Sequence, residues 1–207
     1  DAYLNQKEDR KKPALANFDV LSSPAKIIAQ HFGFKGTNYV LDAACASSIF
    51  AFDLAVRKLL NGELDAVLSG GVSLPDPLYT QMGFSQLGAL SKSGVSSPLD
   101  QKADGIVVGE GAGIFVLKRL EDAISDKDHI YGLIAGVGLS NDVDGKLLAP
   151  SSEGQLRAMR QAYKKAGINP ADLSLIECHA TGTPVGDGVE LESISKLLAE
   201  KKNQKAV

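Results

Sequence analysis

Two residues of this sequence combine reactive chemistry with an unusual local setting, and Cys45 is the first of them. It lies in the stretch DAACASSIF, between an apolar run that ends at Leu41 and a helical pattern that begins at Ser47. A strand that leads into a helix through small residues places the thiol at the helix N-terminus, where the helix dipole favours a thiolate. The local sequence leaves two interpretations open, a nucleophile and an inert buried thiol.

The second residue is His179, one of three histidines. It ends the apolar segment Leu173–Cys178 and precedes a turn of small residues, Ala-Thr-Gly-Thr-Pro. Open α/β sheets form their sites at the C-terminal ends of strands, so His179 is the candidate partner of Cys45, with a packed histidine as the alternative. His31 lies within a predicted helix and His129 follows a charged Asp-Lys-Asp stretch, so neither is expected to be functional.

Other chemistries fit the sequence less well. Cys178 is adjacent to His179 in a predicted strand, so the two side chains point to opposite faces and Cys178 is expected in the core. The C-x-x-C and H-x-x-x-H spacings of zinc sites are missing. The stretch GEGAG (109–113) precedes an alternating strand pattern, which predicts a glycine turn and not a nucleotide loop, with Glu110 held by a buried partner. A Cys followed later by a His also fits the order of papain-like peptidases. Their signature C-G-[SA]-C-[WY] is missing, however, and the sequence contains no Trp.

Strands and helices are predicted to alternate along the chain, as in α/β folds with largely parallel sheets. Helices are predicted at 24–32, 47–60, 121–126, 153–167 and 188–202, and strands at 64–71 and 130–140. A turn and a strand are predicted within 34–44, a strand and a turn within 174–183, and two more strands around a glycine turn within 106–120. The 47–60 helix is expected to be buried on most faces, with Asp53, Arg57 and Lys58 on one narrow polar side. Ser152-x-x-Gln155 predicts a capping box.

Composition excludes several classes of function. With 207 residues, of which 44% are hydrophobic, the chain can bury a sizeable core. A net charge of -3 gives no reason to expect nucleic acid or an anionic membrane as partner. Two cysteines form no disulfide framework, and we expect a reducing, cytoplasmic setting. The polar start without Met is expected to be a cut within a longer protein, and the fragment alone is expected to be inactive and poorly soluble.

Three ordered motifs carry a resemblance to a known family. VLDAACASS, PLDQKADGIVVGEGAG and IECHATGTPVGD resemble the signatures of β-ketoacyl synthases of fatty acid and polyketide synthesis, and HFGFKGTNYVLDAACASS and GFSQLGALS fit the same family. The resemblance implies the α/β thiolase fold, a five-layer αβαβα sandwich of two similar halves, here truncated. Residues 1–126 would form the N-terminal half with the nucleophile, and residues 127–207 part of the C-terminal half.

The resemblance also implies roles for individual residues. It matches Cys45 to the acyl-accepting nucleophile, His179 to the first of two catalytic histidines, Thr181 and Thr183 to hydroxyls that hold the phosphopantetheine arm, Phe84 to an aromatic residue of the acyl pocket, and Glu190 to a supporting acidic residue. Ala180 departs from the commoner Gly, and DAACASS departs from the DTACSSS of many modular polyketide synthases. In both departures the sequence resembles the ketosynthases of polyunsaturated fatty acid synthases and related iterative systems. A motif resembling K-S-N-x-G-H, which carries the family's second histidine and lysine, is not found.

The implied activity is decarboxylative Claisen condensation of a Cys45-bound acyl chain with a malonyl unit. The implied partners are an acyl carrier protein and acyl and malonyl thioesters, in a homodimer or a multidomain synthase, with no metal, no cofactor of the protein itself, no nucleic acid and no membrane. Because the helix dipole is expected to ionise Cys45, loading is expected not to need His179. The alternatives are a non-catalytic subunit similar to chain-length factors, which usually lack the Cys, and a thiolase-type or starter-condensing relative.

Overall fold

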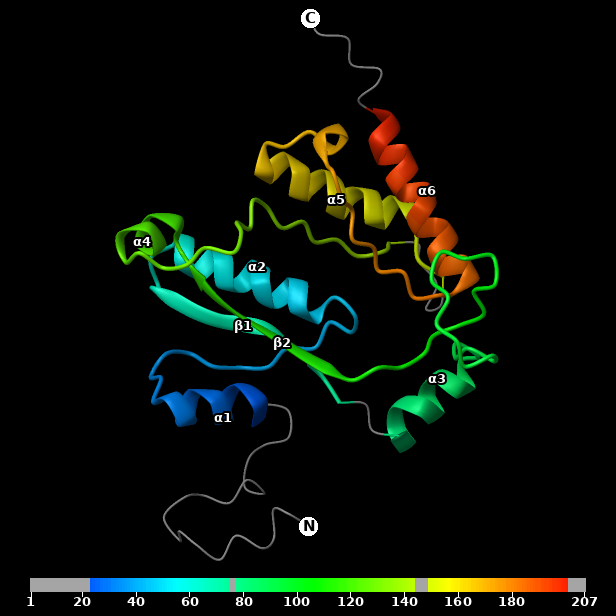
Figure 1. The fold of residues 1–207 in the computed structure, drawn as a ribbon, viewed down its shortest axis with the longest axis horizontal. Coiled ribbons are helices and arrows are strands. Elements are labelled where there is room, and N and C mark those ends of the chain that lie inside the picture. Colours follow the sequence, from blue (N-terminus) through cyan, green and yellow to red (C-terminus); the bar gives the residue numbers. More distant parts are fainter. Residues whose placement is uncertain (1–22, 75–76, 144–148, 201–207) are drawn as a thin grey trace, which may run out of the picture.

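The structure is a computed structural model that describes residues 23–74, 77–143 and 149–200. The elements in these ranges are α1 (Ser23–Phe32), α2 (Ser47–Leu60), β1 (Ala66–Ser73), the π-helix η2 (Pro77–Gln81), α3 (Met82–Gln86), β2 (Gly111–Lys118), α4 (Leu120–Ser125), α5 (Ser152–Ala166), the 3₁₀ turn η3 (Pro170–Asp172) and α6 (Pro184–Glu200). Figure 1 shows α5 and α6 together at one end, α1 and α3 at the other, and α2 with β1 and β2 between them.

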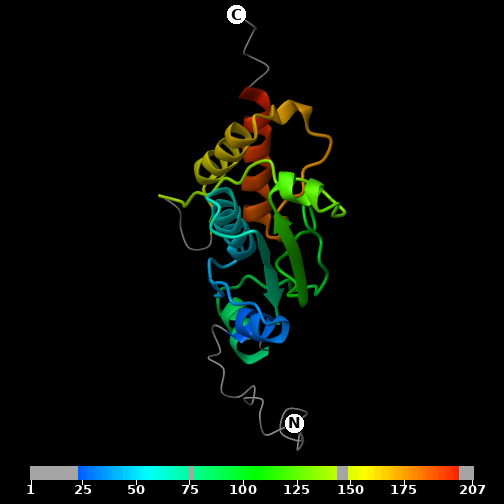
Figure 2. The same cartoon turned by 90° about the vertical axis from the view of Figure 1, so that its left-hand side faces the viewer.

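The helix after Cys45 begins and ends where the sequence predicts, at Ser47 and Leu60. It stops at Asn61-Gly62, where Gly62 adopts a φ of 72° that most residues avoid. Figure 2 shows α2 alongside the two strands, and α2 packs on β1 through a face that includes Ala55 and Leu59. Within the described residues it is not buried on most faces, because Ile49 is 44% exposed.

Asp53 lies on the buried side of α2 and not on a polar side, contrary to the sequence-based expectation. Its side chain is 8% exposed and pairs with Arg57 at 2.7 Å and with Lys165 of α5 at 3.6 Å. A buried carboxylate needs such partners, because loss of hydration penalises its charge. Lys165 also donates to the carbonyl of Val137 at 2.7 Å. The ion pair between Asp53 and Lys165 therefore joins the first half of the chain to the second.

The sheet of the described residues has two antiparallel strands, with Ala66 opposite Lys118 and Ser73 opposite Gly111. Gly70 is needed here because a Cβ atom would collide with the carbonyl of Gly113 on β2. The prediction of two strands around a glycine turn is half wrong, because only the segment after the turn forms a strand and Ile106 makes an isolated bridge with Leu90. Glu110 is exposed, so the buried partner expected for it is also wrong.

Three other predicted strands, within 34–44, at 130–140 and within 174–183, form no strand in the structure. A strand is defined by ladder hydrogen bonds, and an apolar segment gains them only where another strand lies beside it. The 130–140 segment instead packs on α5, so closely that a Cβ at Gly136 would lie 2.5 Å from the carbonyl oxygen of Ala162. The parallel sheet expected from the alternating pattern is therefore not seen within the described residues.

Helices α5 and α6 pack on each other through a small core that includes Leu156, Leu197 and the fully buried Ser193. The Ser193 hydroxyl donates to the carbonyl of Val189 at 2.7 Å, which satisfies it inside the core. The predicted capping box is wrong, since the N-cap is Ser151 and it makes no side-chain cap hydrogen bond. The N-terminus of α5 is held instead by Asp142, which accepts from the Ser151 N–H at 2.8 Å.

Candidate active site

Cys45 lies in a tight turn immediately before α2. Ala44, just before it, adopts a left-handed φ of 51°, and Ala46 is the N-cap of the helix. The hydroxyl of Ser47 stabilises this turn, because it donates to the Ala44 carbonyl at 2.7 Å and accepts from the Ala43 N–H at 2.9 Å. The Asp42 carboxylate accepts from the Ala44 N–H at 2.8 Å. The turn holds the thiol at the helix N-terminus and leaves it exposed.

His179 lies in a second tight turn, which Glu190 of α6 holds in place. One carboxylate oxygen of Glu190 accepts from the His179 backbone N–H at 2.7 Å, and the other accepts from the Ala180 N–H at 2.9 Å. Ala180 has a left-handed φ of 47°, so the chain reverses directly after the histidine. Glu190 is half-buried and bonds to the backbone of the turn, and the supporting role that the resemblance implies for it stays a prediction.

The side chains of Cys45 and His179 interact, and each favours the charged form of the other. The hydrogen bond from His179 is the largest cause that lowers the pKa of Cys45, against an opposing effect of burial. The same hydrogen bond is the largest cause that raises the pKa of His179, and burial again opposes it. A thiolate beside an imidazolium is the state that these shifts favour. The expectation that the helix N-terminus ionises Cys45 stays a prediction, and His179 is a second group that favours the thiolate.

Thr181 and Thr183 follow His179 in the same turn and are both half-buried. Their hydroxyl oxygens lie 2.8 Å apart, within hydrogen-bond distance of each other. Either hydroxyl can exchange this bond for one to a ligand, because a hydroxyl both donates and accepts. Their binding of a phosphopantetheine arm stays a prediction.

The remaining predicted residues lie outside this pair of turns. Phe84 is half-buried within α3, and its contact with an acyl chain stays a prediction. Cys178 is half-buried, not fully in the core, and burial is the largest cause that raises the pKa of its thiol. His31 packs on Phe32 and His129 on Tyr131, so both have structural ring contacts.

The sequence analysis missed Asp187, a buried carboxylate in the first turn of α6 that is 5% exposed. One of its oxygens accepts from the Gly182 N–H at 3.1 Å, in the turn that carries His179. The other accepts from the Leu99 N–H at 2.7 Å, in the loop of residues 98–105. No signal in the sequence distinguishes Asp187 from an ordinary acidic residue at a helix N-terminus, because its second partner lies 88 residues away.

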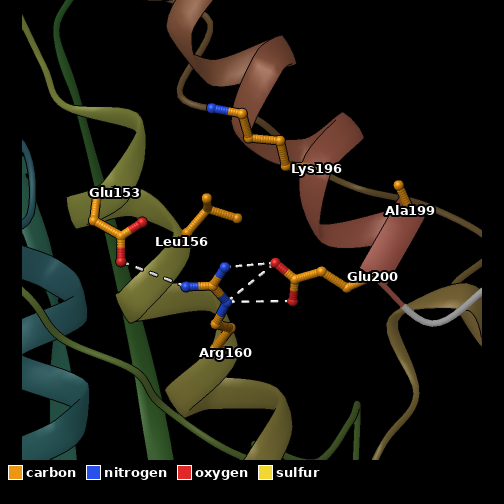
Figure 3. Close-up of a pocket in the computed structure, with 6 residues that line it drawn as sticks. All are labelled: Glu153, Leu156, Arg160, Lys196, Ala199 and Glu200. Carbon is orange, nitrogen blue, oxygen red and sulfur yellow. Dashed lines mark hydrogen bonds and ion pairs between the residues drawn. The ribbon is translucent and has the colours of Figure 1, made fainter. Parts of the chain in front are cut away.

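A shallow pocket lies elsewhere, between α5 and α6, and Figure 3 shows its lining. Arg160 forms a fork with the carboxylate of Glu200, with its Nη2 atom 2.5 Å from Oε1, and approaches Glu153 at 3.5 Å. These charges satisfy one another in an exposed setting, so we assign the pocket no part in the chemistry. Among the described residues, no group of three or more His, Cys, Asp and Glu side chains is placed to hold a metal ion. No helix in the same ranges has the length and apolar character needed to cross a membrane.

Family models of known proteins match both parts of the chain. The model for "Beta-ketoacyl synthase, N-terminal domain" matches residues 1–123, and that for "Beta-ketoacyl synthase, C-terminal domain" matches residues 131–207. One component of the polyunsaturated fatty acid synthase of Thraustochytrium sp. is 37% identical over 203 residues, which are 97% of this chain and 10% of that protein.

Two solved structures agree with the sequence comparisons. The ketosynthase from module 6 of the bacillaene synthase of Bacillus subtilis 168 is 40% identical with a TM-score of 0.83, over 90% of this chain and 34% of that one. A structure described as "PfaC Keto synthase-Chain length factor" is 44% identical with a TM-score of 0.81, over 87% of this chain and 20% of that one. The chain therefore spans about a third of a solved ketosynthase and about a tenth of the curated relative.

The thiolase fold expected from the sequence is confirmed by this likeness, and the described helices and small sheet form part of that fold. The chain belongs to the β-ketoacyl synthase family.

Proposed function

We propose that the protein containing this chain is a ketosynthase that condenses a Cys45-bound acyl group with a malonyl unit held on an acyl carrier protein. The observation that carries this proposal is the Cys45–His179 pair. The thiol sits before a helix in a tight turn, and the interaction with His179 lowers its pKa. A thiolate is the nucleophilic form of cysteine, and exposure of this one leaves it open to a thioester.

In the first half-reaction the Cys45 thiolate attacks the carbonyl carbon of an acyl thioester. A new carbon–sulfur bond forms, and the carrier's thiol leaves with a proton. The side chain of His179, whose pKa is raised by its hydrogen bond to Cys45, is the available source of that proton. The acyl group then stays on Cys45 as a thioester.

In the second half-reaction the malonyl thioester loses carbon dioxide and its remaining two carbons become an enolate. The enolate carbon attacks the acyl carbonyl on Cys45, a carbon–carbon bond forms, and the Cys45 thiolate leaves. Negative charge develops on the enolate oxygen, and an N–H donor placed against it lowers the barrier by about 3–4 kcal/mol. His179 supplies such a donor, and Glu190 fixes the backbone from which it projects.

The finer assignments belong to the same proposal. Thr181 and Thr183 would hold the phosphopantetheine arm, and Phe84 would line the acyl pocket. We propose that residues 1–126 and 127–207 belong to the two thiolase-like halves, which the separate matches to residues 1–123 and 131–207 support. A place within a multidomain polyketide or polyunsaturated fatty acid synthase fits the names of the relatives. The homodimer stays a prediction. A cytoplasmic location and independence of a bound metal or cofactor stay predictions.

A second candidate is a non-catalytic chain-length-factor subunit, because one similar structure carries that term in its description. The presence of Cys45 beside His179 favours the enzyme, since a subunit that only shapes the product needs no activated thiol.

The test that separates them is incubation of the complete natural protein with a labelled acyl-pantetheine thioester, followed by mass spectrometry of the Cys45 peptide. An acyl adduct on Cys45 and release of carbon dioxide from a malonyl thioester are expected. A protein that forms no adduct and releases no carbon dioxide would favour the chain-length-factor subunit.

A further inference from the structure

The turn that carries His179 rests on a loop that is remote in sequence, residues 98–105. In Figure 1 this loop lies beside the start of α6. The Asp187 carboxylate joins the two, because it accepts from Leu99 N–H at 2.7 Å in the loop and from Gly182 N–H at 3.1 Å in the turn. A direct bond adds to this, in which the Gly105 N–H donates to the Gly182 carbonyl at 2.9 Å.

The backbone on both sides of this contact adopts conformations that need support. Leu99 has a φ of 60°, in the left-handed region that a branched side chain normally avoids. Gly182 has a φ of 75°, and a Cβ atom there would lie 3.0 Å from the Gly105 carbonyl oxygen. Strained backbone persists only where the surrounding contacts hold it. The carboxylate of Asp187 is 5% exposed and accepts a hydrogen bond with each oxygen, so it stabilises both strained segments.

We propose that Asp187 is a positioning residue whose carboxylate fixes the turn of residues 179–183 against the loop of residues 98–105, and thereby sets the placement of His179 and the two threonines. The inference rests on the proposed function only for the catalytic consequence. The structural part, a carboxylate that bonds to both segments, is independent of the reaction that the site performs.

The charge of Asp187 also reaches the site. The pKa of His179 is raised first by its hydrogen bond to Cys45 and, more weakly, by the charges of Glu190 and Asp187. The charge of Asp187 acts on the His179 pKa, whereas its hydrogen bonds hold the backbone, and a test must separate these two effects. The conformation of the 98–105 loop reports on the hydrogen bonds alone, because no catalytic side chain has been assigned to this loop.

The experiment compares Asp187→Asn, in the complete natural protein, with the matched variant Asp53→Asn. Both residues are buried carboxylates on helices, each 5% exposed, but Asp53 pairs with Arg57 and Lys165, which belong to neither segment. Asparagine keeps the shape and one acceptor oxygen, but its NH₂ group faces a backbone N–H and cannot accept from it. Hydrogen–deuterium exchange, steady-state decarboxylation of a malonyl thioester and thermal melting are measured for both variants.

In Asp187→Asn we expect amide exchange to accelerate about 10-fold or more in both segments together. Decarboxylation is expected to fall in kcat by about 10- to 100-fold and to rise in KM, because a shift of about 1 Å in a catalytic group costs up to about 100-fold. Asp53→Asn is expected to leave exchange in both segments, kcat and KM unchanged even if it lowers the melting temperature.

The inference is overturned if exchange in the two segments stays at the wild-type rate in Asp187→Asn, or accelerates equally in Asp53→Asn. Failure of the proposed function gives a different result. In that case the two segments open in Asp187→Asn, while wild-type protein forms no acyl adduct on Cys45 and releases no carbon dioxide.

Discussion

The thiol of Cys45 and the imidazole of His179 interact although 134 residues separate them in the sequence. Each residue projects from a tight turn next to a left-handed alanine, one before the cysteine and one after the histidine. The hydrogen bond between them lowers the pKa of the thiol and raises the pKa of the imidazole. This pair, the groups that hold it and the packing around it can each be tested in the complete natural protein.

Replacement of Cys45 by Ala should abolish acyl loading, because no other thiol is placed as an exposed nucleophile within the described residues. Mass spectrometry after incubation with an acyl-pantetheine thioester should show the adduct in wild type and not in the variant. Cys178→Ala is the matched control, since burial raises the pKa of that thiol, and it should load normally. An adduct that survives in Cys45→Ala would place the nucleophile elsewhere.

Replacement of His179 by Ala should move the pH dependence of Cys45 alkylation to higher pH. The hydrogen bond from His179 stabilises the thiolate, so its removal raises the pKa of Cys45 and leaves less thiolate at neutral pH. Acyl loading should therefore be slow at pH 7 and recover as the pH rises. Malonyl decarboxylation should fall by about 100-fold or more and not recover with pH, because the N–H donor is missing.

His129→Ala is the control for that variant, because His129 packs on Tyr131 and should affect neither reaction. An unchanged alkylation profile in His179→Ala would mean that the helix N-terminus ionises Cys45, as the sequence alone suggested. Recovery of decarboxylation at high pH would remove His179 from the enolate step.

Replacement of Glu190 by Gln should weaken the turn after His179. The carboxylate accepts backbone hydrogen bonds at 2.7 and 2.9 Å, and an amide can accept only one of them. Loss of a hydrogen bond to a charged group costs about 1.5–3 kcal/mol, and decarboxylation should fall at least as steeply as stability. Chemical denaturation and a decarboxylation assay measure the two effects.

Glu192→Gln, on the same helix, is the matched control, since Glu192 is exposed and forms an i,i+4 ion pair with Lys196. It should change the free energy of unfolding by less than about 0.5 kcal/mol. If the two Gln variants behave alike, the carboxylate of Glu190 has no special role.

Replacement of Gly138 by Ala should destabilise the second half of the chain. A Cβ atom at Gly138 would collide with the backbone carbonyl of Ala158 on α5, whereas one at Gly132 meets nothing within 4 Å. Overpacking of this kind costs about 1–3 kcal/mol, so Gly138→Ala should lower the free energy of unfolding by that amount. Gly132→Ala should be close to neutral, and equal losses in the two variants would contradict the packing seen here.

Helices were the part of the fold that the sequence predicted best. The α2 boundaries follow from local causes, namely an apolar run that begins after small residues and stops at Asn-Gly. The capping box failed because Asp142, nine residues before Ser151, takes the place of a local side chain at the start of α5. Three apolar segments were predicted as strands and form none, because ladder hydrogen bonds depend on neighbours that a local pattern does not contain.

The candidate site was predictable only in part for the same reason. Cys45 and His179 could be singled out from their local settings, since each follows an apolar segment and adjoins small residues. Their mutual effect on pKa could not, because it depends on a contact across the chain. Asp187 was missed altogether, since its importance lies in two backbone N–H groups that only the folded chain brings together.

The left-handed alanines beside the two reactive residues restrict which sequences can carry this site. Ala44 and Ala180 have φ values of 51° and 47°, a conformation that costs about 1–2 kcal/mol for a residue with a Cβ and more for a branched side chain. Gly and Asn can also adopt it, whereas Val, Ile and Thr cannot do so without strain. In a saturation mutagenesis screen these two positions would therefore tolerate almost as few residues as Cys45 and His179, although neither alanine side chain has a part in the proposed chemistry.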